Sequence, residues 1–240
     1  MPVQPSLSQI TFSTAILASA AGCIASLSPP NPTAPANLPS DTPLIEKTRI
    51  TTTQGTFNTL IFGPYSFLAL HTVGLALTYP SIPRWLLPRG SAENLNPDLI
   101  SWSKHTAIPI ALILGVGMPL RLVAYRTLGR SFTFSLAPPK DGLVTTGVYK
   151  WVQHPSYTGA AVIFVAPMVL WYRAGGAMGC WMSGGVARVV ERGVVPVAAG
   201  VLLWMLGMRT RDEERMLRGV FGEEWEVWHK KTARFLPWLF

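Results

Sequence analysis

Two polar stretches of the sequence carry side chains whose types suit the binding of a small charged ligand. The first runs from residue 143 to residue 159 and includes Tyr149, His154 and Tyr157, and the second begins at Arg209 and includes Glu213. Histidine and glutamate hydrogen-bond hydroxyl and amino groups, and tyrosine offers an apolar face with a polar tip. The guanidinium of arginine can hold both oxygens of a carboxylate. These residue types suit a site of mixed polarity for such a ligand.

The spacing of these residues supports their grouping. Arg209 and Glu213 lie four positions apart, so on a helix they face the same side. Pro155 biases His154 toward an extended backbone, which would hold the histidine ring where the following helix begins. If the two stretches fold together, Arg209 and Glu213 become neighbours of the polar residues of the first stretch.

Each of these residues also has a purely structural interpretation. His154 could cap a turn, and Arg209 could extend its side chain to a membrane surface. Glu213 could pair with a nearby arginine on a solvated helix face. Tyr157, Ser156 and Gly159 could serve close helix packing alone. The residues by themselves leave both interpretations open.

The rest of the sequence is apolar enough to indicate a membrane protein. It is 49% hydrophobic and 13% charged, with a mean hydropathy of +0.30, and such a chain cannot hide its apolar residues in one water-soluble globule. The apolar residues gather in five segments: 7–27, 59–79, 107–124, 157–172 and 194–208. The first three are long enough to cross a bilayer, whereas the last two, of about fifteen residues each, are short for a span. We expect connectors at 28–43, 84–96 and 174–193, which are rich in proline or glycine.

The tail carries an apolar stripe. Leu217, Phe221, Trp225 and Trp228 recur at intervals of four, four and three, which predicts an amphipathic helix at the membrane surface or over the bundle. We therefore predict an all-α integral membrane fold, a bundle of about five transmembrane helices with a C-terminal amphipathic cytoplasmic helix. Residues 1–106 would form N-terminal spans and loops, and residues 107–240 the core with the cytoplasmic tail.

Charge and cysteine content narrow the class further. The net charge of +8 on an apolar chain is typical of cytoplasmic loops and anionic lipid headgroups, and no basic surface with interleaved aromatics predicts nucleic-acid binding. Lysine and arginine are more frequent in the 125–156 connector and the tail, which places both on the cytoplasmic face. Cys23 and Cys180 have neither metal-ligand nor disulfide spacing. The first apolar segment lacks a basic leader and is expected to be a retained span.

The two polar stretches together form a recognisable pattern. Its parts are Gly147-Val148-Tyr149, His154-Pro155-x-Tyr157-x-Gly159, Arg209-x-x-x-Glu213-Glu214 and Phe221-Gly222-x-Glu224-Trp225. The pattern, which covers roughly residues 125–240, resembles the isoprenylcysteine carboxyl methyltransferase family. Gln153 departs from it, because the family usually places arginine before the His-Pro pair, and the segment before Leu143, with Ser135 and Asp141, also matches poorly.

The resemblance implies a reaction and a set of roles. The implied reaction is S-adenosylmethionine-dependent methyl transfer to the α-carboxylate of a prenylated cysteine at the C-terminus of CaaX-type proteins. Arg209 would contact that carboxylate, and since the carboxylate is already ionised at neutral pH, no general base is needed. The residues that would bind S-adenosylmethionine are Leu143, Val144, Tyr149, His154, Pro155, Ser156, Tyr157 and Glu213. The implied location is the endoplasmic reticulum membrane, as a multi-pass protein with its active site facing the cytoplasm.

Two other functions fit the same residues. A membrane methyltransferase could act on a phospholipid amine or a small lipophilic molecule, although Arg209 would repel an amine. A non-catalytic membrane scaffold would not bind the methyl donor at all. No Gly-x-Gly-x-x-Gly follows a strand pattern, which argues against a soluble Rossmann-type methyltransferase. Arg121 and His71 lie inside apolar segments, and we favour a structural role for both over the lining of a cavity for the prenyl chain.

Overall fold

The structure is a computed structural model that describes residues 4–28, 54–88, 94–132, 136, 139 and 142–236, with the backbone alone for 54–61. The described residues form helices, turns and one isolated β-bridge, which confirms the all-α prediction. The longer elements are α1 (Leu7–Leu27), α3 (Gln54–Thr78), α4 (Lys104–Leu112), η4 (Ile113–Gly117), α5 (Met118–Leu128), α6 (Pro155–Trp171), α7 (Gly184–Val189), η8 (Val190–Val194), α8 (Val195–Phe221) and α9 (Glu223–His229). The shorter ones are η1 (Arg84–Leu86), η3 (Pro97–Leu99), η5 (Gly129–Ser131), η6 (Gly147–Lys150) and η7 (Ala177–Cys180).

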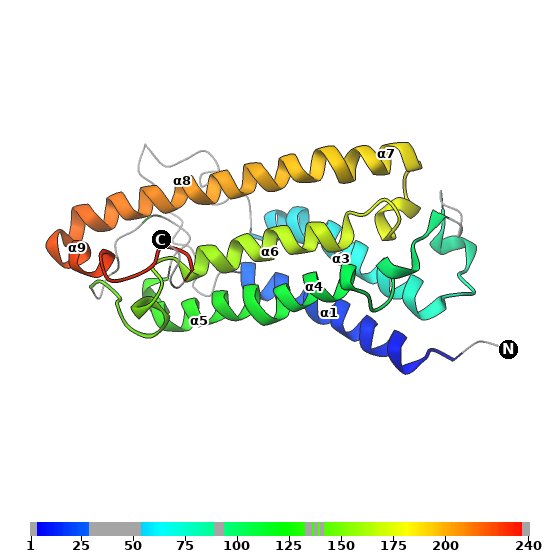
Figure 1. Cartoon of the computed structure of the whole chain (residues 1–240), viewed down its shortest axis with the longest axis horizontal. Helices are drawn as coiled ribbons and strands as arrows, with labels where there is room; N and C mark the ends of the chain where they lie inside the picture. Colours follow the sequence, from blue (N-terminus) through cyan, green and yellow to red (C-terminus); the bar gives the residue numbers. More distant parts are fainter. Residues whose placement is uncertain are drawn as a thin grey trace.

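Helix α6 is central to the bundle and packs against α1, α3, α4, α5 and α8. Figure 1 shows it between the long α7–α8 helix on one side and the α4–α5 helix on the other. The beginning of α6, the end of α8, α9 and the C-terminal segment all lie at the same end of the elongated molecule. Residues that are far apart in the sequence therefore meet at this end.

Two long helices each contain a five-residue π-helical segment, η4 and η8, directly before a proline at the second position of the next α-helical part. Pro119 and Pro196 lack an amide hydrogen, and their rings crowd the carbonyl four residues earlier, which lies inside the π segment in both cases. The wider turn accommodates that clash without breaking the helix. The helices thus continue past both prolines.

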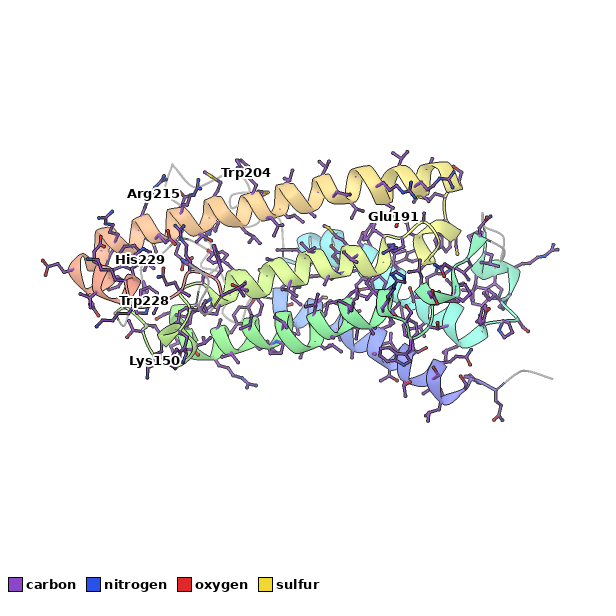
Figure 2. The ribbon with its side chains drawn as sticks, in the orientation of Figure 1. Lys150, Glu191, Trp204, Arg215, Trp228 and His229 are labelled. Carbon is purple, nitrogen blue, oxygen red and sulfur yellow. The ribbon has the colours of Figure 1, made fainter. Side chains whose placement is uncertain are left out.

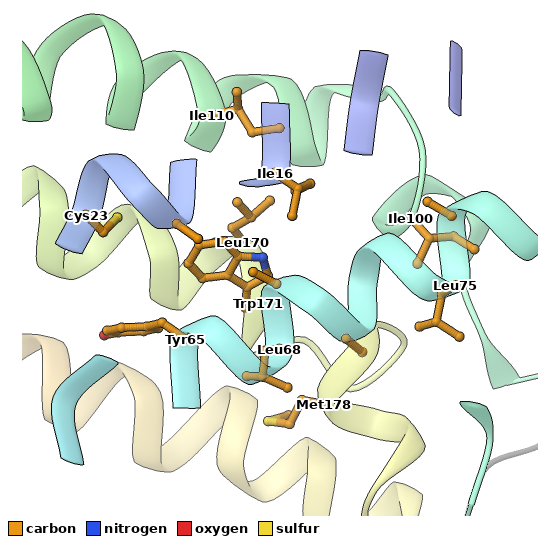
Figure 3. Close-up of a cluster of buried hydrophobic side chains, with 14 of the residues drawn as sticks. Ile16, Cys23, Tyr65, Leu68, Leu75, Ile100, Ile110, Leu170, Trp171 and Met178 are labelled. Carbon is orange, nitrogen blue, oxygen red and sulfur yellow. The ribbon is translucent and has the colours of Figure 1, made fainter. Parts of the chain in front are cut away.

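The main apolar core surrounds Trp171, the last residue of α6, which is 1% exposed. In Figure 3 its indole lies among side chains from α1, α3 and α4, including Ile16, Tyr65 and Ile110. Cys23 also lies in this core, and both it and Cys180 are buried and unbridged. The core therefore joins the N-terminal helices to the far end of α6.

Three helical stretches of the described chain are long and apolar enough to span a membrane: Leu7–Leu27, Pro97–Ser131 and Gly184–Phe221. The last corrects two expectations. Residues 184–193, predicted as part of a connector, are helical, and the fifth segment, predicted to be short for a span, is part of a 38-residue helix of about 57 Å. Glycine weakens a helix by only about 1 kcal/mol per residue, so the valines and alanines around Gly184 and Gly193 keep the chain helical. Only 174–183 remains as the turn.

The tail stripe lies on two helices, where one was predicted. The chain turns at Gly222, whose φ of 52° lies in the left-handed region that favours glycine, so α8 ends at Phe221 and α9 begins at Glu223. Leu217, Trp225 and Trp228 are nevertheless buried together, in a second apolar cluster. In Figure 2 Trp228 lies at the same end of the molecule as Lys150.

The two polar residues inside apolar segments hold the bundle together. His71 Nε2 lies 2.9 Å from the carbonyl oxygen of Leu86, and Trp181 Nε1 donates to His71 Nδ1 at 3.3 Å. Arg121 is 4% exposed, and its Nε donates to the carbonyl oxygen of Ser26 at 3.0 Å. Arg121 therefore does not extend to a membrane surface, and the structural role that we favoured for both residues fits these bonds.

Candidate active site

The two polar stretches meet at the shared end of α6 and α8. His154 precedes α6, and its Nε2 lies 3.1 Å from Oε1 of Glu214 on α8. Tyr157, in the first turn of α6, donates its hydroxyl proton to Oε2 of Glu213 at 2.6 Å. The predicted meeting of two segments separated by more than fifty residues is thus present as two direct hydrogen bonds. His154 and Glu213 lie on adjacent helices at one end of the bundle.

Tyr157 links the two helix-spaced residues of α8. Its hydroxyl donates to Glu213 and also lies close enough to Arg209 for the charge of that guanidinium to act on it. Arg209 and Glu213 therefore do face the same side of α8, as their spacing predicted. A carboxylate held by Arg209 would lie beside the acidic group of Glu213, with the Tyr157 ring between α8 and α6.

His154 does not cap a turn with its side chain. Its ring makes the bond to Glu214, while its backbone carbonyl accepts from the amides of Tyr157 and Thr158, both at 3.1 Å. The backbone angles of His154 are φ −124° and ψ 53°, so proline at the next position restricts it without making it fully extended. The ring is thereby directed across to α8.

Leu143, Val144 and Tyr149 reach the same end of the molecule through the second apolar cluster. Leu143 and Val144 are half-buried and pack against the cluster that contains Tyr149. Trp228 Nε1 donates to the carbonyl oxygen of Tyr149 at 2.9 Å, which fixes the 147–150 turn against α9. Burial, and secondarily the charge of Glu213, raises the pKa of Tyr149, so this buried hydroxyl stays neutral.

Pro155 and Ser156 are buried where α6 begins, and the contacts of Ser156 are structural. Ser156 Oγ accepts from Arg121 Nη1 at 2.8 Å. A Cβ on Gly159 would lie 2.8 Å from Arg121 Cγ and 2.9 Å from the carbonyl oxygen of Gly117, so glycine is required for α5 and α6 to approach this closely. The packing interpretation therefore accounts for Gly159 and Ser156, and a ligand role for Ser156 remains a prediction.

Three further residues belong to this end of the molecule and were not predicted as site residues. Glu214, rather than Glu213, is the partner of His154. Arg234, beyond the second stretch, forms an ion pair with Glu214. Gln153 is 4% exposed and bonds to His229 and Thr232. The Glu213-Glu214 pair of the motif pointed to Glu214. Nothing local in the sequence pointed to Arg234 as a site residue, because no local pattern shows where the tail folds back.

Gln153, which departs from the family pattern, hydrogen-bonds the tail through both atoms of its side-chain amide. Its Nε2 donates to the carbonyl oxygen of Thr232 at 2.8 Å and to that of His229 at 3.1 Å, and its Oε1 lies 2.9 Å from His229 Nδ1. A neutral amide serves here because it both donates and accepts, which a guanidinium cannot do. Gln153 therefore helps to hold the tail in this chain.

Comparison with known proteins agrees with the motifs. The model of the Isoprenylcysteine carboxyl methyltransferase (ICMT) family matches residues 109–182. The Protein-S-isoprenylcysteine O-methyltransferase of Homo sapiens is 29% identical over 181 residues, which are 72% of this chain and 55% of that protein. The protein of the same name from Saccharomyces cerevisiae is 28% identical over 154 residues, 60% of this chain and 56% of that protein.

The chain thus spans about half the length of the curated relatives that it matches. No solved structure matches it. The family match covers α6 with His154 and Tyr157, and the match to the human protein extends over most of the chain. The family model and these relatives agree with the resemblance seen in the motifs, and the chain is similar to the isoprenylcysteine carboxyl methyltransferases.

Proposed function

We propose that this chain is an S-adenosylmethionine-dependent methyltransferase that esterifies the α-carboxylate of a prenylated cysteine at protein C-termini. The observation that carries the proposal is the interaction of Tyr157 with both Arg209 and Glu213. It supports the idea that the residue suited to the acceptor carboxylate lies next to a residue suited to the methyl donor. The names of the relatives, all isoprenylcysteine O-methyltransferases, support the same acceptor class.

The residues at this end fit a cationic nucleoside donor. Glu213 places a carboxylate at this end, and it can accept more hydrogen bonds than the single one that Tyr157 donates to it. The Tyr149 and Tyr157 rings add aromatic surface, which favours a cation or a flat base. When bound, S-adenosylmethionine supplies an electrophilic methyl group on a positively charged sulfur.

The role of Arg209 in this proposal is orientation. Its guanidinium holds the prenylcysteine carboxylate, which is an anion at neutral pH, and directs one oxygen at the methyl carbon. A C–O bond forms as the carbon–sulfur bond breaks, and the electron pair of that bond remains on sulfur as the neutral thioether. No proton moves in this step. A general base is therefore unnecessary among the residues of this site.

A groove of about 450 Å³ between α4, α6 and α8 offers a place for the prenyl chain. Most of its lining is apolar, with Leu112, Val165 and Leu203 among the contributors, and Lys104, His105 and Arg173 also line it. Leu203 lies six residues from Arg209 on α8, about 9 Å along the helix axis. If Arg209 holds the carboxylate of a prenylated cysteine, the prenyl chain can therefore extend along α8 into this groove.

The proposal includes a membrane arrangement. In the 38-residue stretch that ends with α8, the 18-residue apolar window has no buried side chains, so its surface suits lipid contact. In Figure 2 Trp204 points away from the bundle, as a lipid-facing residue would. Beyond residue 208, Arg209, Arg211 and Arg215 would lie at the cytoplasmic surface.

We propose about five spans, with residues 1–106 as the N-terminal part and 107–240 as the membrane-embedded methyltransferase core. The C-terminal helices would lie on the cytoplasmic face, in the endoplasmic reticulum membrane. Prenylated CaaX-type C-termini and the lipid bilayer would be the partners.

The test uses the whole chain purified in detergent. Calorimetry measures binding of S-adenosylmethionine, and a methylation assay compares N-acetylated farnesylcysteine with a phospholipid amine. We expect the donor to bind and the farnesylcysteine alone to be methylated. Arg209→Ala should abolish turnover and leave donor binding largely intact. Methylation of the amine instead would establish the other methyltransferase function, and a chain that does not bind the donor would be a scaffold.

A further inference from the structure

The C-terminal segment runs alongside the start of the site. Val152 and Ala233 form a parallel β-bridge, and the amide of Ala233 donates to the carbonyl oxygen of Trp151 at 3.1 Å. The amides of Gln153 and His154 donate to the carbonyl oxygens of Ala233 and Arg234, at 2.8 and 3.0 Å. Backbone hydrogen bonds to the tail thus hold the backbone of His154, and they do not involve the Arg234 side chain.

The Arg234 side chain continues from this bridge to Glu214. Its Nε donates to Glu214 Oε1 at 2.6 Å, and its Nη2 donates to Oε2 of the same carboxylate. The pair is a two-pronged fork, the strongest arrangement between these groups. Glu214 in turn bonds the His154 ring and is 8% exposed, and its carboxylate raises the pKa of Arg234. A continuous chain of contacts therefore runs from Arg234 through Glu214 to His154.

The next residue of the tail covers the His154 ring. The Phe235 ring centroid lies 5.9 Å from that of His154, and the Tyr157 ring lies 5.6 Å from it on an edge contact. Thr158 Oγ1 donates to the carbonyl oxygen of Phe235 at 2.8 Å, which fixes this part of the tail on α6. The His154 ring is consequently enclosed by Tyr157 of α6, Glu214 of α8 and Phe235 of the tail.

Building on the proposed function, we propose that Arg234 is a positioning residue for the methyl donor: by gripping Glu214 in a fork, it fixes the carboxylate that orients the His154 ring. The tail itself does not depend on this grip, because backbone bonds and Gln153 already hold residues 232–235 in place. Loss of the Arg234–Glu214 fork therefore keeps the fold intact and allows the Glu214 carboxylate to rotate. The consequence is a looser His154 and weaker donor binding.

The experiment compares Arg234→Gln, Arg234→Lys and a control in detergent-purified full-length protein. The control is Arg218→Gln, which removes an exposed arginine from an ion pair in which Arg218 Nε lies 2.6 Å from Glu226 Oε1. Each variant is measured for its Kd for S-adenosylmethionine by calorimetry, its KM for N-acetylated farnesylcysteine, and its Tm.

We expect Arg234→Gln to raise the donor Kd about tenfold, because the Glu214 carboxylate that orients the His154 ring then loses its charge-assisted partner. The acceptor KM and the Tm should stay near those of the unaltered chain. The donor Kd of Arg234→Lys should lie between those of the unaltered chain and Arg234→Gln, because an ammonium can contact one carboxylate oxygen but cannot form the fork. The Arg218→Gln control should change none of these constants.

Two results would overturn the inference alone: an unchanged donor Kd in folded Arg234→Gln protein, or donor and acceptor constants that worsen together with a lowered Tm. If Arg234→Gln does not fold, the lysine variant decides, and a donor Kd equal to that of the unaltered chain refutes the role. If the unaltered chain does not bind S-adenosylmethionine, the proposed function fails and this inference fails with it.

Discussion

The hydroxyl of Tyr157 is the smallest group whose removal tests the candidate site. Tyr157→Phe deletes one oxygen and keeps the ring in place between α6 and α8. The deleted group donates to Glu213 Oε2 at 2.6 Å and also interacts with Arg209, so the substitution releases both α8 residues at once. A hydrogen bond to a charged group contributes about 1.5–3 kcal/mol. At about 1.4 kcal/mol per factor of ten, kcat/KM should fall roughly 10- to 150-fold.

The assay is methylation of N-acetylated farnesylcysteine over a range of S-adenosylmethionine concentrations, with the Tm measured alongside. The matched control is Tyr172→Phe, at the far end of the same helix, where the tyrosine ring packs edge-on against Tyr65 at 6.0 Å. This control should keep nearly full kcat/KM. Full activity in Tyr157→Phe, or an equal loss in Tyr172→Phe, would refute the reasoning that this hydroxyl organises the site.

Two further predictions concern packing and the acceptor groove. Gly159→Ala should lower stability by about 1–3 kcal/mol, because its Cβ would meet Arg121 and the Gly117 backbone, whereas Gly185→Ala, in open space on α7, should leave the Tm unchanged or raise it. A Tm for Gly159→Ala equal to that of the unaltered chain would contradict the close approach. Leu203→Trp should raise the acceptor KM several-fold, by about 1 kcal/mol, with the donor Kd unchanged. A normal acceptor KM in that variant would place the prenyl chain outside the groove.

The helices of this chain were largely predictable from local pattern. The segment 7–27 is helix α1, and its start carries a capping box between Ser6 and Gln9. Long apolar runs signal helices because a backbone in lipid must satisfy its own hydrogen bonds. The prediction was wrong between residues 184 and 193, where glycine indicated a turn and the neighbouring valines and alanine keep the chain helical.

The residue types of the candidate site could be read from the sequence, and the spacing of two of them agrees with the structure. Arg209 and Glu213 share a helix face, as a four-residue interval requires, and Tyr157 joins them. Which glutamate contacts His154 was not predictable, since adjacent residues on a helix point in directions about 100° apart. That choice depends on the rotation of α8 against α6.

The sequence by itself determined the membrane class, the helical content, the residue types of the candidate site and the family that they resemble, because these depend on composition and short-range spacing. Only the tertiary structure decided that Glu214 faces His154, that Gln153 binds the tail, and that Arg234 returns to grip Glu214. These are contacts between residues 20 to 79 positions apart. Such contacts depend on how helices pack and rotate against one another, and no local pattern in the chain encodes that arrangement.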